Sequence, residues 1–246
     1  MLRPRVYVEV PFKSGELIDL NESVSRHVGK ALRMQPGDRL CLFDGRGIEA
    51  KASIHAITRK TLTVRIEETS PVDRESPLAI SLAVSMSRGD RMDTIVQKAT
   101  ELGVTRILPF SSERTELRLS EDRTTKKLTH WRNITASACE QCGRNFVPSI
   151  ESPCDFRTLL SLLAEDSKSL KLVLHPGMSR ESLPSLCADL TLLIGPEGGL
   201  SKAEVEQAIA SGFKPLSLGP RVLRTETAPL TAIAVAQARW GDLLAP

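Results

Sequence analysis

Two glycine-containing loops hold the residues best suited to bind a small ligand. The first leaves an apolar run at residues 192–194, passes through Gly195-Pro196-Glu197-Gly198-Gly199, and enters a predicted helix with Ser201 and Glu204 as a capping box. Because glycine lacks a Cβ atom, a flat ligand can approach such a backbone closely. The composition is equally typical of a tight strand-to-helix turn, and the spacing matches neither a dinucleotide fingerprint nor a Walker loop.

The second loop leaves a predicted strand at residues 215–218, turns at Gly219-Pro220 and enters the last predicted helix. A third apolar run ends at Leu174-His175-Pro176-Gly177. Open α/β sheets bind ligands just beyond the carboxyl ends of their strands, so we expect these three loops to line one pocket. Two residues have structural alternatives: Glu226 also complements a helix dipole, and His175 before proline also suits a plain turn.

The elements that must position these loops lie after a polar, proline-containing segment at residues 68–77. Before it, short strand-like runs with turn signals predict a small β-rich domain over residues 1–72, with one helix that begins at Asn21 as N-cap. After it, strand and helix patterns alternate over residues 73–246. That alternation predicts an α/β domain with a parallel sheet covered on both faces.

The charge is uneven along the chain. The whole sequence has a net charge of +3, which divides into +5 over residues 1–144 and −2 over residues 145–246. The first part is therefore the better candidate for a polyanion-binding surface, although a solvated surface of mixed charge gives the same count.

Several classes of protein are disfavoured by composition. No apolar run approaches the length of about 18 residues that a membrane span needs, and the N-terminal segment lacks the apolar core of a signal peptide, so we expect a cytoplasmic protein without a membrane segment. Five scattered cysteines argue against a disulfide framework. Cys139 and Cys142 match half a zinc site, but no second pair completes it, and no metal is expected.

Four segments together carry a resemblance to a known family. They are Gly195-Pro196-Glu197-Gly198-Gly199-Leu200-Ser201, the run from Leu218 to Ala228, Arg91-Met92-Asp93 with Lys98 to Gly103, and Glu140-Gln141-Cys142-Gly143-Arg144. In this order they resemble the 16S ribosomal RNA (uracil-N3) methyltransferases of the SPOUT superfamily. The resemblance covers essentially the whole chain, and the glycine loops show no departure from the family pattern.

The resemblance implies an architecture that composition and periodicity do not show. A PUA-like β-barrel domain that helps to hold RNA is expected over residues 1–72, followed over residues 73–246 by a parallel-sheet methyltransferase domain with a trefoil knot. General topology rules would predict an unknotted chain. The family also implies a homodimer that acts on 16S rRNA, within the small ribosomal subunit.

The implied cofactor is S-adenosyl-L-methionine (SAM), held by the three loops. The expected cofactor-binding residues are Leu174, His175, Ile194, Gly195, Pro196, Glu197, Gly199, Leu218, Gly219, Leu223, Arg224, Thr225 and Ala228.

Methylation of uracil at N3 requires loss of the imide proton from an accessible base edge. Arg144 is the first candidate for holding the uracil oxygens or the deprotonated imide, because a guanidinium is a fixed fork of donors. Glu140, four residues earlier, could act as general base or merely pair with Arg144. Arg114 follows a strand end and is a candidate RNA or substrate contact. Arg3, Arg5 and Arg33 are the expected RNA-binding residues of the first domain.

Two other functions stay open on the sequence alone. A SPOUT enzyme that methylates a ribose 2′-hydroxyl of tRNA or rRNA would keep the cofactor loops but need no imide deprotonation. A non-catalytic RNA-binding protein of ribosome assembly would keep the fold, although the intact glycine loops argue against it.

Overall fold

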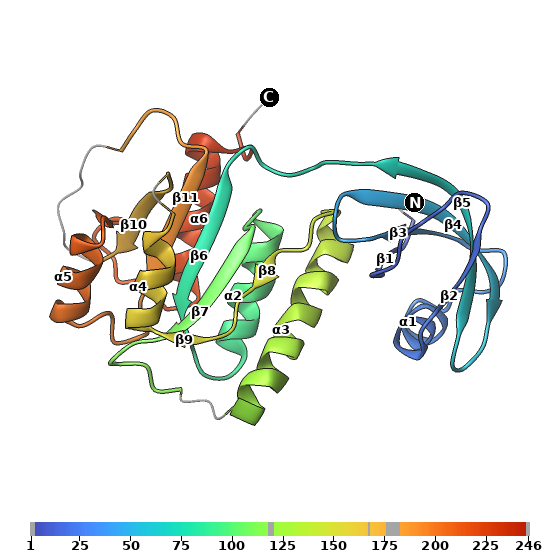
Figure 1. Ribbon diagram of the computed structural model, residues 1–246, viewed down its shortest axis with the longest axis horizontal. Helices are drawn as coiled ribbons and strands as arrows, with labels where there is room; N and C mark the ends of the chain where they lie inside the picture. The colour runs from blue at the N-terminus through green and yellow to red at the C-terminus, as the bar shows by residue number, and fades with distance from the viewer. Residues whose placement is uncertain (1–2, 118–120, 167, 176–182, 245–246) are drawn as a thin grey trace. The chain divides into compact units, whose positions relative to one another are not determined.

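Residues 3–117, 121–166, 168–175 and 183–244 are described by the structure, a computed structural model (Figure 1). Pro176 and Gly177 of the third predicted loop lie outside the described residues. The chain forms two units, the first built from residues 1–75 and 136–147 and the second from residues 76–135 and 148–246. Residues 136–147 thus pack with the N-terminal part, from which they are distant in sequence.

The first unit is built on a five-stranded sheet. Its strands lie in the order β1-β3-β4-β5-β2, with β1 parallel to β3 and the other neighbours antiparallel. Along β5, Leu62, Val64 and Ile66 are buried and alternate with more exposed residues, so one face of the sheet forms the core of this unit. The strands are β1 (Arg5–Tyr7), β2 (Leu17–Leu20), β3 (Arg39–Phe43), β4 (Ile48–Ile57) and β5 (Leu62–Pro71).

One helical segment interrupts these strands. Helix α1 (Glu22–Arg26) begins after Asn21, whose side chain accepts a hydrogen bond from the Val24 N–H, so the predicted N-cap is confirmed. The segment continues as one turn of π-helix, η1 (His27–Ala31). The strand-like run at residues 5–10 forms a strand only over Arg5–Tyr7, because the Val10 N–H turns back to the Val8 carbonyl at 3.0 Å.

The second unit is an α/β fold, as predicted. Its strands lie in the order β12-β10-β11-β6-β7-β8, with β9 also paired to β7, and every pair is parallel. The strands are β6 (Ala79–Ser85), β7 (Arg106–Ser111), β8 (Ser149–Ile150), β9 (Cys154–Asp155), β10 (Leu170–Leu174), β11 (Asp189–Ile194) and β12 (Lys214–Leu216).

The helices connected to these strands are α2 (Asp90–Glu101), α3 (Glu121–Cys142), α4 (Phe156–Ala164), α5 (Lys202–Ala210) and α6 (Thr227–Trp240). Helix α4 was not predicted from the sequence. It begins after Asp155, whose carboxylate accepts a hydrogen bond from the Thr158 N–H at 2.8 Å.

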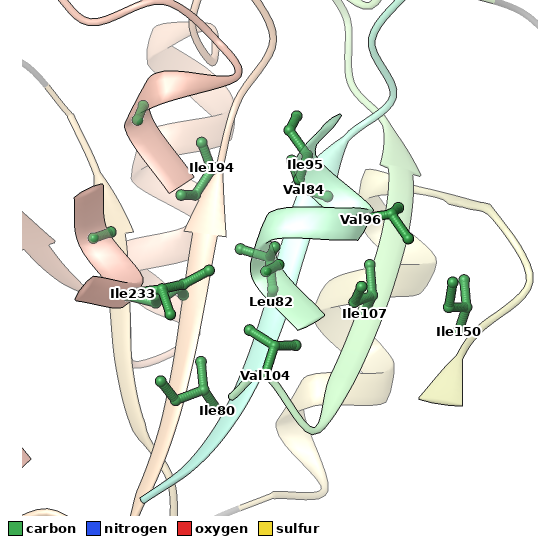
Figure 2. Packing of buried hydrophobic residues seen from close by; sticks show 14 of the residues in the cluster. Ile80, Leu82, Val84, Ile95, Val96, Val104, Ile107, Ile150, Ile194 and Ile233 are labelled. Atoms are coloured by element: carbon green, nitrogen blue, oxygen red, sulfur yellow. The ribbon is translucent and has the colours of Figure 1, made fainter. Parts of the chain in front are cut away.

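Buried residues alternate between the two faces of the parallel sheet. Leu82 and Leu192 pack into one core with α2 and α6, and Figure 2 shows Ile80, Leu82 and Val84 of β6 in this cluster. Ala83 and Leu193, their neighbours in sequence, pack into the other core with α4 and α5. The prediction of a sheet covered on both faces is therefore confirmed. Because the strands are parallel, the loops that follow β6, β7, β10, β11 and β12 all emerge at the same edge.

Candidate functional site

A pocket of about 360 Å³ lies at this edge of the sheet, in the second unit. Its walls come from the loops after β10, β11 and β12, and from one side chain of the loop after β7. A cavity of this size is within the range that small-molecule ligands occupy. The lining residues are Arg114, Leu174, His175, Ile194, Gly195, Pro196, Glu197, Gly198, Gly199, Leu200, Leu216, Ser217, Leu218, Gly219, Arg221, Val222, Leu223, Thr225 and Ala228.

The glycine loop, residues 195–201, turns tightly between β11 and α5. The Gly199 N–H donates to the Pro196 carbonyl at 2.8 Å, and Gly199 has a φ of +67°, which disfavours any residue with a Cβ atom. A Cβ atom on Gly195 would lie 2.8 Å from the backbone nitrogen of Leu200. The predicted capping box of Ser201 and Glu204 is confirmed, so the loop enters α5 with its first amides satisfied.

The arginine loop, residues 219–226, leads from β12 to α6. Gly219 has a φ of +101°, and the backbone carbonyl of Arg224 accepts hydrogen bonds from the Thr227 and Ala228 N–H groups at 3.0 and 2.9 Å. Thr225 is buried, and its hydroxyl lies 3.4 Å from the Ser87 hydroxyl. The Arg224 backbone therefore shapes the start of α6, while Thr225 faces both the pocket and the segment after β6.

His175 is the third-loop residue with an unsatisfied polar atom. Its backbone N–H donates to the Leu216 carbonyl at 3.1 Å, which fixes the residue beside β12. Its ring atom Nδ1 is buried and has no hydrogen-bond partner among the described residues. A buried ring nitrogen without a partner costs free energy, so a bound ligand that supplies a hydrogen bond would stabilise this wall of the pocket.

The β7 loop, residues 112–117, is fastened to the glycine loop at two points. The Arg114 guanidinium donates to the Gly198 carbonyl at 2.8 Å. The buried carboxylate of Glu204 accepts from the Glu113 N–H and from the Ser201 N–H, both at 2.8 Å. The loops after β7 and β11, which are not consecutive strands in the sequence, therefore form one connected wall of the pocket.

Arg91, at the start of α2, bridges the glycine and arginine loops. Its Nη1 lies 2.6 Å from Glu197 Oε1, and its Nε lies 3.9 Å from Glu226 Oε2. Asp93, in the same sequence motif, accepts a hydrogen bond from the Trp131 indole N–H at 3.2 Å and so anchors α3. In the sequence analysis, this motif supported only the family resemblance. Its acidic and basic residues lie on one helical turn, and that pattern could have indicated a role in holding elements together.

The structure brings together all but one of the expected cofactor-binding residues. Arg224 is the exception, because its side chain does not line the pocket. Arg114, expected as a substrate contact, lies in the same wall. Six further lining residues were not predicted, although they lie between or beside the expected ones and could have been found by including whole loops: Gly198, Leu200, Leu216, Ser217, Arg221 and Val222.

The other two candidate catalytic residues belong to the first unit. The Arg144 side chain is 7% exposed, and its Nε donates to both carboxylate oxygens of Glu75 at 3.0 Å. Glu140 accepts a hydrogen bond from the Tyr7 backbone N–H at 3.0 Å. Burial raises the pKa of the Glu140 carboxyl, although the Tyr7 N–H opposes this shift. Glu75, 69 residues away in sequence, is thus the carboxylate that accepts from the Arg144 Nε, where the sequence suggested Glu140.

Arg5 also has partners inside the first unit. Its guanidinium donates to Glu49 at 2.6 Å and to the Asn145 side-chain oxygen at 2.5 Å, while Arg74 donates to the same Glu49 oxygen at 3.1 Å. Arg3 and Arg33, by contrast, are exposed. Among the three expected RNA-binding residues, Arg5 therefore has a structural role, because its guanidinium holds parts of the first unit together.

The Glu49 ion pairs should make the first unit sensitive to acid. Burial opposes ionisation of Glu49, but hydrogen bonds from Arg5 and Arg74 outweigh it and lower the pKa from 4.5 to about 2. The stabilisation is therefore complete above the unfolded-state pKa and is lost as the pH falls toward about 2. Chemical denaturation at several pH values should show this loss, and Glu49→Gln should be less stable at neutral pH and respond less to acid. An identical pH dependence in Glu49→Gln would contradict the assignment.

No helix among the described residues combines the length and apolar character of a bilayer span. Within the ranges that the structure covers, no group of three or more His, Cys, Asp or Glu side chains is arranged to hold a metal ion.

Comparison with known proteins identifies the two parts of the chain. Residues 74–237 match the model of an RNA methyltransferase domain, and residues 20–67 match that of an RNA methyltransferase PUA domain. Ribosomal RNA small subunit methyltransferase E of Buchnera aphidicola subsp. Schizaphis graminum is 36% identical to the chain over 98% of each.

Two solved structures are also similar. A protein from Legionella pneumophila, solved with bound SAM, is 43% identical, with a TM-score of 0.93 over 99% of this chain and 100% of that one. A ribosomal RNA small subunit methyltransferase E from Neisseria gonorrhoeae, bound to S-adenosyl methionine, is 38% identical, with a TM-score of 0.91 over 98% and 99%.

These matches span both units and confirm the resemblance predicted from the four motifs. They also confirm that the second unit has the parallel-sheet fold of that family and that the first carries a PUA-like domain. The chain therefore belongs to the RNA methyltransferase family that includes the ribosomal RNA small subunit methyltransferases E.

Proposed function

We propose that the protein uses SAM to methylate N3 of a specific uridine in 16S ribosomal RNA. The observation that carries the proposal is the pocket formed by the three loops after β10, β11 and β12, in a chain whose relatives are small-subunit rRNA methyltransferases. Similar chains from two bacteria were solved with SAM bound. The family resemblance supplies the uracil N3 position.

The residues of the pocket fit SAM. A Cβ atom on Gly199 would lie in open space, so this side of the glycine loop is accessible to a flat group such as adenine, whereas Gly195 is required for the turn itself. Leu174, Ile194 and Leu218 supply apolar surface, and the buried Nδ1 of His175 needs a polar partner. When bound, SAM supplies a methyl group that is already activated on a sulfonium.

The chain's own residues would position the acceptor and exclude water. Arg114 lies in the pocket wall, held by the Gly198 carbonyl, and its guanidinium is suited to hold the oxygens of a uracil ring as negative charge develops on them. Fixing the reacting nitrogen in line with the methyl group can supply several kcal/mol of the barrier. Catalytic roles for Glu140 and Arg144 stay predictions, because their observed contacts lie within the first unit.

Finer features of the architecture also stay proposals. We infer from the family a trefoil knot in the parallel-sheet domain, a closed PUA-like barrel, and a domain division at residues 1–72 and 73–246. A two-fold symmetric homodimer is proposed as well, acting in the cytoplasm on rRNA of the small subunit.

Nucleoside mass spectrometry of 16S rRNA tests the proposed reaction. A strain that lacks the gene should lose N3-methyluridine, and a plasmid copy of the wild-type gene should restore it. The same plasmid with Gly195→Leu should fail to do so. Loss of a ribose methyl group instead, or no change in any 16S nucleoside, would replace the proposed reaction.

RNA binding by the first unit can be tested at its exposed arginines. Arg3→Glu with Arg33→Glu should weaken binding to 16S rRNA fragments, and the log–log salt slope should fall by about 0.7 to 0.9 for each phosphate that the protein no longer neutralises. Lys202→Glu with Lys214→Glu, on the second unit, makes the matched charge change. Filter binding between about 50 and 200 mM salt should separate the two variants. Equal losses in both variants would indicate only a general charge effect.

A further inference from the structure

The pocket of about 360 Å³, here called the cofactor pocket, can admit an acceptor base only through its opening. Methyl transfer requires the reacting atoms to approach to about 3 to 3.5 Å. The pocket is near the lower end of the range of about 300 to 1,000 Å³ that small-molecule ligands occupy, so bound SAM leaves little room for a second ring. The RNA contacts are therefore expected among the lining residues that are also exposed, which we call the mouth of the pocket. They are Arg114, Glu197, Gly198, Arg221 and Val222.

Two loops flank this mouth from opposite sides. Arg114 belongs to the β7 loop, whereas Arg221 and Val222 belong to the arginine loop after β12. In the sheet order β12-β10-β11-β6-β7, strands β10 and β11 lie between β12 and β7. A nucleotide that reaches the pocket therefore passes between Arg114 on one side and the tip of the arginine loop on the other.

The charge of the mouth suits an anion. Arg114 donates to the Gly198 carbonyl, a neutral partner, and neither Arg114 nor Arg221 pairs with a carboxylate in the ranges that the structure describes. Glu197, the carboxylate of the mouth, is already paired at 2.6 Å with Arg91, which does not line the pocket. The opening therefore attracts a polyanion such as RNA, and an exposed guanidinium without an ion pair is suited to bind a phosphate.

The arginine loop also presents an apolar side chain at the mouth. Val222 is 85% exposed, while its neighbours Leu218 and Leu223 are partly buried and pack against the core of the second unit. Folding therefore gains little from the Val222 side chain. The loop is held by the turn at Gly219 and by the buried Thr225, so its tip has a defined position. An apolar side chain there can contact the face of a base that has been swung out of its stack.

We propose that Arg221 and Val222 hold the acceptor nucleotide at the mouth of the cofactor pocket. The Arg221 guanidinium binds a phosphate beside the target uridine, and Val222 contacts the face of its base, while Arg114 approaches the base from the opposite side. This inference rests on the proposed function and adds the residues that set the position of the acceptor. Because SAM also carries a carboxylate, the experiments must distinguish a phosphate of the RNA from that group.

The salt dependence of RNA binding tests the phosphate contact. Arg221→Ala should lower the log–log salt slope for a 16S rRNA fragment by about 0.7 to 0.9, because one phosphate is no longer neutralised, and should leave the Kd for SAM unchanged. Lys202→Ala removes an exposed cation of the same unit that does not line the pocket, and should leave both quantities unchanged. An unchanged salt slope in Arg221→Ala, or a raised Kd for SAM, would overturn the assignment.

A neutral backbone group identifies the phosphate directly. We expect an rRNA fragment with a methylphosphonate on either the 5′ or the 3′ side of the target uridine to bind wild-type protein more weakly. At that position the same replacement should have no further effect on Arg221→Ala, because the two changes remove one interaction. If the losses caused by the protein and RNA changes simply add at both positions, Arg221 contacts neither phosphate and the proposal is wrong.

A charge at the tip of the arginine loop tests the contact with the base. Val222→Asp should lower kcat/KM for RNA methylation by about 100-fold, the loss that a displacement of about 1 Å can cause, with unchanged melting temperature and SAM affinity. Leu186→Asp is the matched control, because Leu186 is 87% exposed in the same unit, does not line the pocket and receives the same charge. Equal methylation by the two variants would contradict the proposal. If wild-type protein forms no N3-methyluridine on any 16S fragment or subunit, the proposed function itself fails, and that result is separate from a misplaced base in an active enzyme.

Discussion

Gly195→Ala should abolish SAM binding at ordinary concentrations, whereas Gly198→Ala should leave it nearly unchanged. An added Cβ atom at Gly195 would lie 2.8 Å from Leu200 N and 3.2 Å from the Gly199 carbonyl carbon, and backbone atoms cannot move aside as a flexible side chain can. At Gly198 the nearest atom would be Arg114 Cδ at 3.5 Å, an ordinary contact. The glycine loop must therefore change shape in the first variant only.

We expect Gly195→Ala to raise the Kd for SAM by at least about 100-fold, which corresponds to about 2.7 kcal/mol. Isothermal titration calorimetry gives the Kd, and thermal unfolding shows whether the second unit stays folded. A folded Gly195→Ala protein with wild-type affinity would remove the glycine loop from the cofactor site. A comparable loss in Gly198→Ala would show that the effect is not specific to the predicted clash.

Arg144→Ala should destabilise the first unit by about 3 to 5 kcal/mol, the usual cost of removing one partner of a buried ion pair. The Arg144 and Glu75 side chains are 7% and 17% exposed, so the substitution leaves a carboxylate with little solvation. Arg74→Ala is a useful comparison, because Arg74 is 46% exposed and its pairing with Glu49 should contribute no more than about 1 kcal/mol.

Urea denaturation measures these differences, and the double variant Arg144→Met with Glu75→Leu should recover much of the loss because no charge is left unpaired. The catalytic role predicted for Arg144 makes a different claim. It requires a protein of near wild-type stability whose single-turnover methylation rate falls by about 100-fold or more. Stability and rate measured on the same preparation therefore decide between an ion-pair anchor and a catalytic donor.

Local patterns in the sequence were sufficient to predict the three loops that line the pocket, while their assignment to a cofactor came from the family resemblance. Glycines at 195 and 199 and the capping box at Ser201 are short-range signals, and the α/β alternation places the loops at strand ends. Long-range pairing carries no such signal. Glu75 and Arg144 are 69 residues apart, and nothing in either segment indicates that the other is its partner.

The same limit applies to a hollow of about 710 Å³ in the second unit, lined in part by Ser112, Asp155 and Gln207, which the sequence did not predict. Its polar residues come from three segments around Ser112, Asp155 and Gln207, and they meet only because β9 pairs with β7 while α4 and α5 cover one face of the sheet. Helix α4 itself was not predicted although its apolar spacing is clear, because the two-residue strand β9 and the Asp155 cap before it resemble irregular chain. Strand order, which fixes the neighbours of each loop, cannot be obtained from periodicity.

The Glu204 carboxylate has a consequence for motion. One buried side chain holds an amide of the β7 loop and an amide of the glycine loop, so neither loop can move far without breaking a hydrogen bond to the same group. The Glu113 and Ser201 amide hydrogens should therefore exchange with deuterium through a common opening event, with similar protection that falls together in Glu204→Gln. Because both amides donate to this one carboxylate, opening of the β7 loop and opening of the glycine loop are coupled.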